Sequence, residues 1–260
     1  MVALGTAHLG VGCGTSRSLG RSRDGVSWQW EERQAGACGD CQWVGGVAWL
    51  DNGSGGVWVA GGGTGTRLYS KDDGRTWTQS NARGRNAYRR FRSDGVRAVG
   101  AGQGVLTVVE LAPTSAAEPV TWYDSDGPPH ESVFLAAGNG AFVAVWYNDG
   151  CRFLREGTTW APCVLPEGRD PVITSVVFGN GKFSILGHGA PLESTDGEHW
   201  SLASSGTGTD FRDVAFGNGT YLTPWSYSPD GRSWKNATRS AQNGYAVAAG
   251  RLGDAHACPR

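Results

Sequence analysis

The chain has 260 residues, of which 42 are glycine and 12 are tryptophan, and its formal net charge is -1. Such a balance argues against a nucleic acid partner, because phosphate binding requires a marked positive excess. No stretch approaches the roughly 18 to 20 apolar residues of a membrane-spanning helix, so we expect no insertion into a membrane.

A short pattern, Ser-x-Asp-(x)-Gly-x-x-Trp with an optional residue before the Gly, recurs along the chain, and we call each copy a box turn. Clear copies occupy residues 22–28, 70–77, 194–200 and 228–234. A worn copy at 154–160 keeps the Gly and Trp, and another at 124–127 has lost its Trp. The aspartates of the pattern are Asp24, Asp72, Asp126, Asp196 and Asp230, and its tryptophans are Trp28, Trp77, Trp160, Trp200 and Trp234.

Each box turn follows a segment that predicts a β-hairpin. The clearest hairpins are centred on Asn139-Gly140, Asn180-Gly181 and Asn218-Gly219, and each pair lies between two apolar runs. Asn-Gly in this setting is a strong hairpin signal, because both residues tolerate a positive φ. Units are therefore expected to start near residues 2, 47, 96, 133, 175 and 213, with a closing strand near 246–252.

A unit spacing of roughly 33 to 49 residues corresponds to four short strands per unit. No helical periodicity of useful length is present. We therefore expect an all-β fold, a single β-propeller domain over residues 1–260 with four-stranded antiparallel blades stacked around an axis. Six blades are expected, and seven, with a partial blade, are the alternative.

The box turns and the Gly-Asn-Gly hairpins together resemble the Asp-box (BNR) repeats of sialidase-like propellers, over nearly the whole chain. The regular recurrence of the aspartate predicts a structural role rather than catalysis or metal binding. We expect Asp and Ser side chains to bond backbone N–H groups, Gly to adopt the left-handed conformation, and Trp to pack under the turn.

Four antiparallel strands per blade place the Asn-Gly hairpins and the box turns at one end. The opposite end carries the second-to-third loops and the connections between blades, where ligands are expected to bind. The ligand-binding candidates at that end are Trp146, Tyr147, Asp149, His188, Trp225, Tyr227, Arg92, Arg169 and Arg212. In the alternative interpretation, the aromatic residues fill the core between blades and the arginines stabilise loops.

One basic cluster precedes the third unit. It contains Arg83, Arg85, Arg89, Arg90, Arg92 and Arg97, with Tyr88 and Phe91 among them. An anionic glycan or an acidic protein partner would suit it, since guanidinium groups bind carboxylates in a bidentate manner. We favour a solvated connector for this segment, and the binding surface is the alternative.

Sialidase chemistry is poorly supported by the residues. The family uses three arginines on the substrate carboxylate, a Tyr–Glu nucleophile pair and an Asp acid/base, and it carries an Arg-Ile-Pro motif near its start. This chain has no Arg-Ile-Pro, and no Tyr–Glu pair can be assigned. Other glycosidases need only two carboxylates about 5 to 10 Å apart, and the sequence does not select a pair. We therefore assign no catalytic residue.

The cysteines and histidines predict disulfides rather than a metal site. The five histidines show no ligand spacing, so we expect no metal and no cofactor. Six cysteines allow about 15 pairings; our hypothesis is Cys13–Cys258, Cys38–Cys41 and Cys151–Cys163, with a redox pair as the alternative for Cys38 and Cys41. Pairing suits an oxidising compartment, so a secreted, periplasmic or cell-surface location is expected, with the leader absent from this chain.

These observations lead to a functional expectation. The chain is interpreted as an exported, non-catalytic binding propeller that recognises a glycan through the face opposite the box turns. The first alternative is an interaction or scaffold subunit of a surface or periplasmic assembly with a protein partner, and the second is a glycoside hydrolase.

Overall fold

The computed structural model describes residues 44–51, 53, 55–129, 132–147, 150–167, 172–188, 191–203, 213–223 and 225–236, together with the backbone of four short strands before residue 33. Apart from one three-residue 3-10 turn, η1 (Gly63–Gly65), the regular structure of these residues is entirely β. No helix among them is long and apolar enough to cross a membrane.

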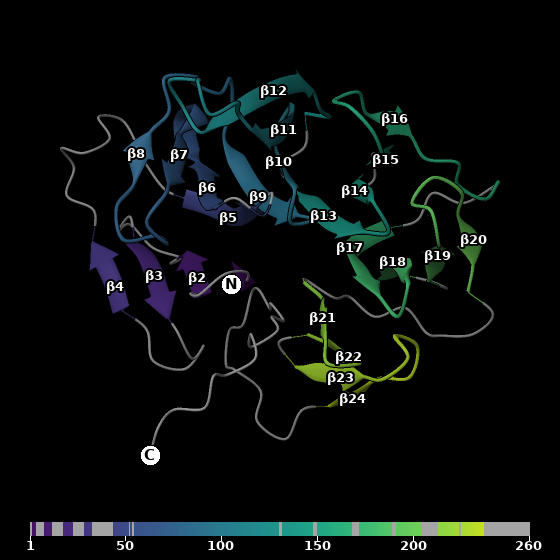
Figure 1. Ribbon diagram of the computed structural model, residues 1–260. Helices are drawn as coiled ribbons and strands as arrows, with labels where there is room; N and C mark the ends of the chain where they lie inside the picture. Colours follow the sequence, from purple (N-terminus) through teal and green to yellow (C-terminus); the bar gives the residue numbers. More distant parts are fainter. Residues whose placement is uncertain are drawn as a thin grey trace, which may run out of the picture.

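The described strands form six four-stranded antiparallel sheets, which we number in chain order (Figure 1). Sheet 1 contains β1 (Val2–Ala3), β2 (His8–Val11), β3 (Ser18–Ser22) and β4 (Gln29–Glu32). Sheet 2 contains β5 (Val44–Asp51), β6 (Gly56–Gly62), β7 (Arg67–Ser70) and β8 (Thr78–Gln79). Sheet 3 contains β9 (Tyr88–Ser93), β10 (Arg97–Gly102), β11 (Val105–Leu111) and β12 (Val120–Asp126).

The second half of the chain repeats this arrangement with shorter outer strands. Sheet 4 contains β13 (Val133–Gly138), β14 (Ala141–Trp146), β15 (Cys151–Leu154) and β16 (Ala161–Pro162). Sheet 5 contains β17 (Val172–Gly179), β18 (Lys182–His188), β19 (Leu192–Ser194) and β20 (Ser201–Leu202). Sheet 6 contains β21 (Ala215–Gly217), β22 (Thr220–Leu222), β23 (Ser226–Ser228) and β24 (Lys235–Asn236).

The first strands of successive sheets lie next to one another. Strand β5 contacts β9, β9 contacts β13, β13 contacts β17, and β17 contacts β21. Figure 1 shows these strands around a common centre, with the later strands of each sheet farther out. Any residue on a first strand is therefore close to the centre of the molecule.

The third sheet begins earlier than the sequence suggests. Its first strand is β9, Tyr88–Ser93, whereas a start near residue 96 was expected. The segment is rich in arginine, but Tyr88 and Phe91 are fully buried, and the Phe91 ring lies where a Cβ on Gly61 or Gly100 would be. Burial of these two rings between sheets 2 and 3 makes the segment a strand rather than a connector.

This shift moves the turns of sheet 3 to different positions. The turn at 103–104 joins the second and third strands, and Asp126 ends the fourth strand instead of following the third. The Asp126 carboxylate is 95% exposed and lies 3.5 Å from Arg85 Nη1. Asp126 therefore belongs to no box turn, and its neighbouring sequence matches the pattern by composition only.

The hydrophobic core lies between sheets rather than within them. Leu50, Val59 and Val109 fill the space between sheets 2 and 3, and Val143, Phe183 and Trp200 fill the space between sheets 4 and 5. Each small sheet buries its faces only against its neighbours, as expected of stacked repeats.

A repeated glycine contact fixes the spacing of sheets 4, 5 and 6. A Cβ on Gly138 would lie 2.2 Å from the Phe178 ring, and one on Gly179 would lie 2.5 Å from the Phe216 ring. The first glycine of the Gly-Asn-Gly hairpins in sheets 4 and 5 is thus needed for close approach of the next sheet. The Asn and the second Gly supply the positive φ of the turn, as expected.

Candidate functional site

The molecule has two different ends, because the strands of each sheet alternate in direction. In sheets 4, 5 and 6 one end, which we call the box face, carries the Asn-Gly hairpins and the box turns. The other end, the loop face, carries the second-to-third loops and the connections between sheets. The box face and the loop face must be assessed separately as binding surfaces.

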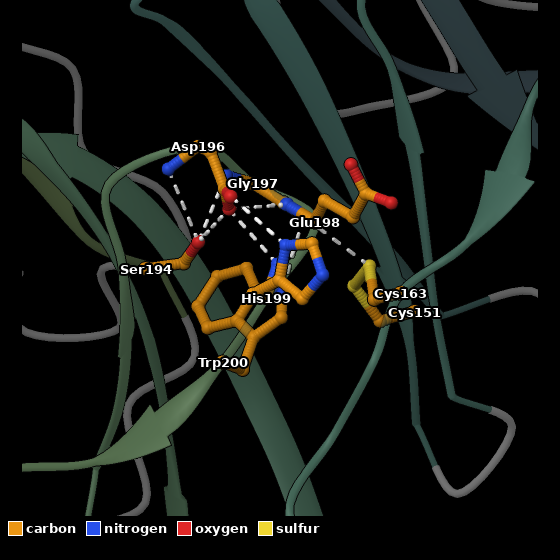
Figure 2. The surroundings of a disulfide bond; sticks show 8 residues. All are labelled: Cys151, Cys163, Ser194, Asp196, Gly197, Glu198, His199 and Trp200. Carbon is orange, nitrogen blue, oxygen red and sulfur yellow. Dashed lines mark hydrogen bonds and ion pairs between the residues drawn. A yellow bond between two sulfur atoms is a disulfide. The ribbon is translucent and has the colours of Figure 1, made fainter.

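The aspartates of the box turns bond their own turns. In sheet 5 the Oδ1 atom of Asp196 accepts hydrogen bonds from the backbone N–H groups of Glu198 at 2.9 Å and His199 at 2.8 Å. Trp200 Nε1 donates to the Gly197 carbonyl at 3.0 Å (Figure 2). Burial opposes ionisation of Asp196, but the hydrogen bonds from His199 outweigh it and hold the pKa of the carboxyl well below its usual range.

The same arrangement recurs in sheets 2 and 6. At Asp72, burial is outweighed by hydrogen bonds from Thr76 and Ser70, which lower its pKa to about 2. At Asp230, the backbone N–H groups of Ser233 and Arg232 lower the pKa to about 2. These carboxylates are ionised acceptors within their own turns, which suits a structural role. The first box turn, with Asp24 and Trp28, lies outside the described residues.

One expected disulfide is present, between Cys151 and Cys163. It links the start of β15 to the residue after β16, and the Cys163 N–H also donates to the Cys151 carbonyl at 3.0 Å. Figure 2 shows the disulfide beside the box turn of sheet 5. The adjoining Val164 exchanges backbone hydrogen bonds with Glu198 and Trp200 of that turn, so the disulfide holds a junction between sheets. Cys13, Cys38, Cys41 and Cys258 lie outside the described residues.

The aromatic candidates of the loop face have different environments. Trp146 is 0% exposed and packs in the core between sheets 3 and 4. The prediction that its ring stacks on a ligand is therefore wrong. Tyr147 is 46% exposed and Tyr227 is 40% exposed, while Trp225 is partly buried. Among the residues that the structure describes, no hydrogen bond or ring contact joins these three side chains into one site. Asp149, Arg169, Arg212 and the side chain of His188 lie outside the described residues.

The basic cluster divides into two groups. Arg83, Arg85 and Arg89 are exposed in or beside the connection that leads from sheet 2 to sheet 3, on the loop face. Arg90 and Arg92 lie on β9, the first strand of sheet 3, next to the centre. Arg97 begins β10 at the box face. Its Nε atom lies 3.6 Å from Oδ2 of Asp94, and its Nη2 atom donates to the Arg155 carbonyl.

Arg90 links two sheets that are distant in sequence. Its Nη1 atom lies 3.3 Å from Oδ1 of Asp213, a buried residue immediately before sheet 6. Its Nε atom donates to the Val133 carbonyl at 2.9 Å, and its guanidinium lies 4.8 Å from the centre of the Phe134 ring. The pair therefore extends from sheet 3 to the opposite side of the central region.

Arg92 adds a second guanidinium to this group. Burial lowers its pKa, the negative charge of Asp213 partly offsets that effect, and the positive charge of Arg90 reinforces it. The charge of Asp213 therefore acts on both guanidinium groups, and the ion pair is with Arg90. Arg90 and Arg92 both belong to the basic cluster recognised in the sequence, where they occupy alternate positions of one strand, but nothing in the sequence pairs them with Asp213.

A second buried charge cluster lies between sheets 2 and 3. Arg67 is 3% exposed, forms an ion pair with Asp124, and donates from Nε to the Tyr88 hydroxyl at 3.0 Å. Its guanidinium also lies 4.9 Å from the centre of the Trp122 ring. Burial raises the pKa of Tyr88 to about 12, despite the opposing charge of Arg67. The Arg67 guanidinium is buried at the junction of the two sheets, and Asp124 is the more exposed partner of the pair.

Among the described residues, no group of three or more His, Cys, Asp or Glu side chains is arranged to hold a metal ion. The geometry instead presents arginines near the centre and on the adjoining loop face. Such an arrangement can bind anionic groups by charge-assisted hydrogen bonds.

Comparison with known proteins identifies the fold. No protein-family profile matches the chain, and no curated protein matches it. A structure of YCF48 bound to a D1 peptide is similar, with a TM-score of 0.59 and 17% identity over 90% of this chain and 86% of that one. A structure of U3-55K has a TM-score of 0.53 and 9% identity, over 80% of this chain and 67% of that one.

YCF48 is a β-propeller. The likeness to it, together with the antiparallel four-stranded sheets around a common centre, shows that the chain has a β-propeller fold.

Proposed function

We propose that this chain is a six-bladed Asp-box propeller that binds a carboxylate-bearing segment of a partner protein, without catalysis. The six four-stranded sheets and the hydrogen bonding of the box turns support the blade number and the repeat type. The Cys151–Cys163 disulfide supports an exported location, since disulfides persist in oxidising compartments.

The arginines around β9 carry this proposal. Arg90 forms an ion pair with the buried Asp213, and Arg92 lies two residues along the same strand, so the carboxylate of a ligand placed near them would be attracted by two guanidinium groups. Arg83, Arg85 and Arg89 extend the positive charge onto the loop face. An acidic peptide could therefore lie along the connection before β9 and direct a carboxylate toward the centre.

A protein ligand fits this surface better than the glycan expected from the sequence. Stacking on sugars was expected to involve Trp146, and that ring is fully buried. The similar protein YCF48 has been observed with a bound peptide, which is consistent with peptide binding by this fold. Glycan binding is therefore tested as the competing outcome.

The experiment measures binding of a fluorescent glutamate-rich peptide by polarisation, with a glutamine-rich peptide of the same length as the ligand control. A triple variant, Arg83→Ser with Arg85→Ser and Arg89→Ser, is expected to bind at least about tenfold more weakly, because charge-assisted hydrogen bonds each contribute about 1.5 to 3 kcal/mol. The matched protein control is Arg75→Ser, which removes an exposed arginine from a box turn on the other face.

Binding should also weaken as salt concentration rises. Equal binding of both peptides, or equal loss in the triple variant and in Arg75→Ser, would overturn the proposal. Retention of glycans on an array, with no binding of the acidic peptide, would replace it with the glycan interpretation.

A further inference from the structure

Strand β12 (Val120–Asp126) is the outer edge of sheet 3. It ends the strand order of that sheet, so only its inner side is paired with a strand of the sheet. It has seven residues, whereas the outer strands of sheets 2, 4, 5 and 6 have two each. Figure 1 shows β12 at the rim of the molecule. A long outer strand presents a row of backbone N–H and C=O groups to which a further strand can bind.

The hydrogen bonds at the two ends of the β11–β12 pair show which backbone groups point outward. The N–H of Ala112 donates to the Pro119 carbonyl at 2.9 Å, and the N–H of Gly127 donates to the Gly104 carbonyl at 3.2 Å. The register between these ends is unbroken. Hydrogen-bonded and non-hydrogen-bonded pairs alternate along an antiparallel ladder, so the odd-numbered residues of β12 bond β11. The residues whose N–H and C=O groups point away from β11 are therefore Val120, Trp122, Asp124 and Asp126.

The open part of this edge is short and centred on Tyr123, which is 40% exposed. Val120 is only 4% exposed, and at the other end the Asp126 carbonyl accepts a hydrogen bond from Arg152 Nη1 at 2.8 Å. Between them, Asp124 is exposed as a residue although its side chain is only 20% exposed, so its exposed surface is largely backbone. A strand that binds here must therefore pair mainly with the middle of β12.

The buried charge cluster of Arg67 holds this middle stretch in place. The Asp124 carboxylate forms an ion pair with Arg67, and the Trp122 ring lies 4.9 Å from the same guanidinium. Both side chains therefore point toward sheet 2. The Tyr123 side chain lies on the opposite face, because side chains alternate along a strand. An incoming strand thus meets a backbone that is already ordered, which lowers the entropic cost of binding.

A second copy of the chain fits this edge. Laid antiparallel with its Tyr123 opposite Tyr123, the copy places its Trp122 opposite Asp124, and the two residues can exchange both of their N–H···O bonds. A register centred on Asp124 would instead place two aspartates directly opposite each other, and like charges in that position are destabilising. The net charge of -1 also means that two copies repel each other little at long range.

We propose that two copies of this protein associate through β12, antiparallel across a two-fold axis at Tyr123. The two open stretches then become neighbouring strands of one sheet, and the two exposed rings meet as a cross-strand aromatic pair. The paired stretch is short, so the dimer is expected to dissociate on dilution. The association uses the edge of sheet 3 rather than the arginines proposed to bind a peptide, so either surface can be altered without the other.

The test is sedimentation velocity over a range of protein concentrations, in which the wild-type chain is expected to change from one copy to two. Tyr123→Lys and Tyr123→Glu should each raise the dissociation constant of the dimer by roughly tenfold, because each replaces the ring pair with like charges directly opposite. An equimolar mixture of these two variants should dimerise again, since opposite charges then face each other. The matched control is Thr121→Lys, on the same face of β12, which would face Ser125 of the copy and should retain the dimer.

Cysteine variants provide a second measurement. In buffer containing oxidised glutathione, Tyr123→Cys should link two copies by a disulfide, because the Cα atoms of a non-hydrogen-bonded pair are about 4.5 Å apart and a disulfide spans that distance. In Thr121→Cys the two positions would be about 13 Å apart along the strands, so this control and the wild-type chain should not be linked. Urea midpoints equal to that of the wild-type chain establish that the variants are folded.

Three results would overturn the proposal. A wild-type chain that stays monomeric at every concentration would leave the edge to an extended segment of another protein. Equal weakening of the dimer by Thr121→Lys and Tyr123→Lys would exclude pairing centred on Tyr123. Failure of the mixed variants to dimerise, with no disulfide in Tyr123→Cys, would exclude it as well.

Discussion

The buried ion pair between sheets 2 and 3 allows a direct test of what holds two neighbouring sheets together. We predict that Asp124→Asn destabilises the protein, because Arg67 loses its anionic partner while remaining 3% exposed. Asp126→Asn is a matched control on the same strand: Asp126 also faces an arginine, but Arg85 and Asp126 are 76% and 95% exposed.

The magnitude follows from burial. Removing one partner of a buried ion pair costs about 3 to 5 kcal/mol, because the other charge is left uncompensated. Asp124 is 20% exposed, and Arg67 keeps its hydrogen bonds to Tyr88 and to the Ala82 carbonyl, which reduces the loss. We therefore expect Asp124→Asn to lower the free energy of unfolding by about 2 to 3 kcal/mol. Asp126→Asn should change it very little, since exposed ion pairs contribute little.

The assay is urea unfolding of the wild-type protein and both variants, followed by circular dichroism and by tryptophan fluorescence. Trp122 lies beside the Arg67 guanidinium, so its emission should report local change as well as unfolding. The double variant Arg67→Met with Asp124→Leu should recover part of the loss, because an apolar pair leaves no buried charge. Equal unfolding free energies for Asp124→Asn and Asp126→Asn would refute the reasoning.

Three further predictions concern the turns and the disulfide. The pKa values of Asp72 and Asp230 are lowered from 3.8 to about 2 in the folded state, so both groups contribute stability above about pH 4 that is lost as the pH falls toward 2. The urea midpoint of unfolding should therefore decrease as the pH is lowered across this range. A urea midpoint that does not change with pH would contradict the hydrogen bonding of the box turns. Gly138→Ala places a Cβ 2.2 Å from the Phe178 ring and should lower the free energy of unfolding by about 1 to 3 kcal/mol. A second substitution, Phe178→Leu, should restore part of this loss. An unchanged free energy of unfolding in Gly138→Ala would argue against the close approach of sheets 4 and 5. Cys163→Ser should lower the free energy of unfolding by about 2 to 3 kcal/mol, and reduction of the wild-type protein should have the same effect. If thiol titration found Cys163 as a free thiol in the native protein, the disulfide would be excluded.

Local chemistry made much of the fold predictable. Asn-Gly pairs require a positive φ that few other residues adopt readily, so the hairpins at Asn139, Asn180 and Asn218 were located correctly. The Cys151–Cys163 pairing was also expected correctly, because the third and fourth strands of one sheet are close in sequence as well as in space. Both features depend on neighbouring residues along the chain.

Other features depended on contacts between sheets. The sequence interpretation treated the segment before residue 96 as a connector, because its arginines obscure the two rings that are buried on the other side of β9. Trp146 ends an apolar strand and precedes a loop, so its position in the sequence was compatible with either an exposed or a buried side chain. Packing between sheets 3 and 4 determined that it is in the core.

By itself, the sequence determined most of the repeated turns, the four strands of each unit and one disulfide, because these follow from short-range backbone and side-chain chemistry. Only the tertiary structure decided that Arg90 and Asp213 form a pair across the centre, that the Asn139 amide bonds two carbonyls of the next sheet, and that the Arg67 guanidinium is buried. The physical reason is that each of these depends on how one sheet meets another, and no residue pattern within a single unit encodes which groups of a distant unit will face it.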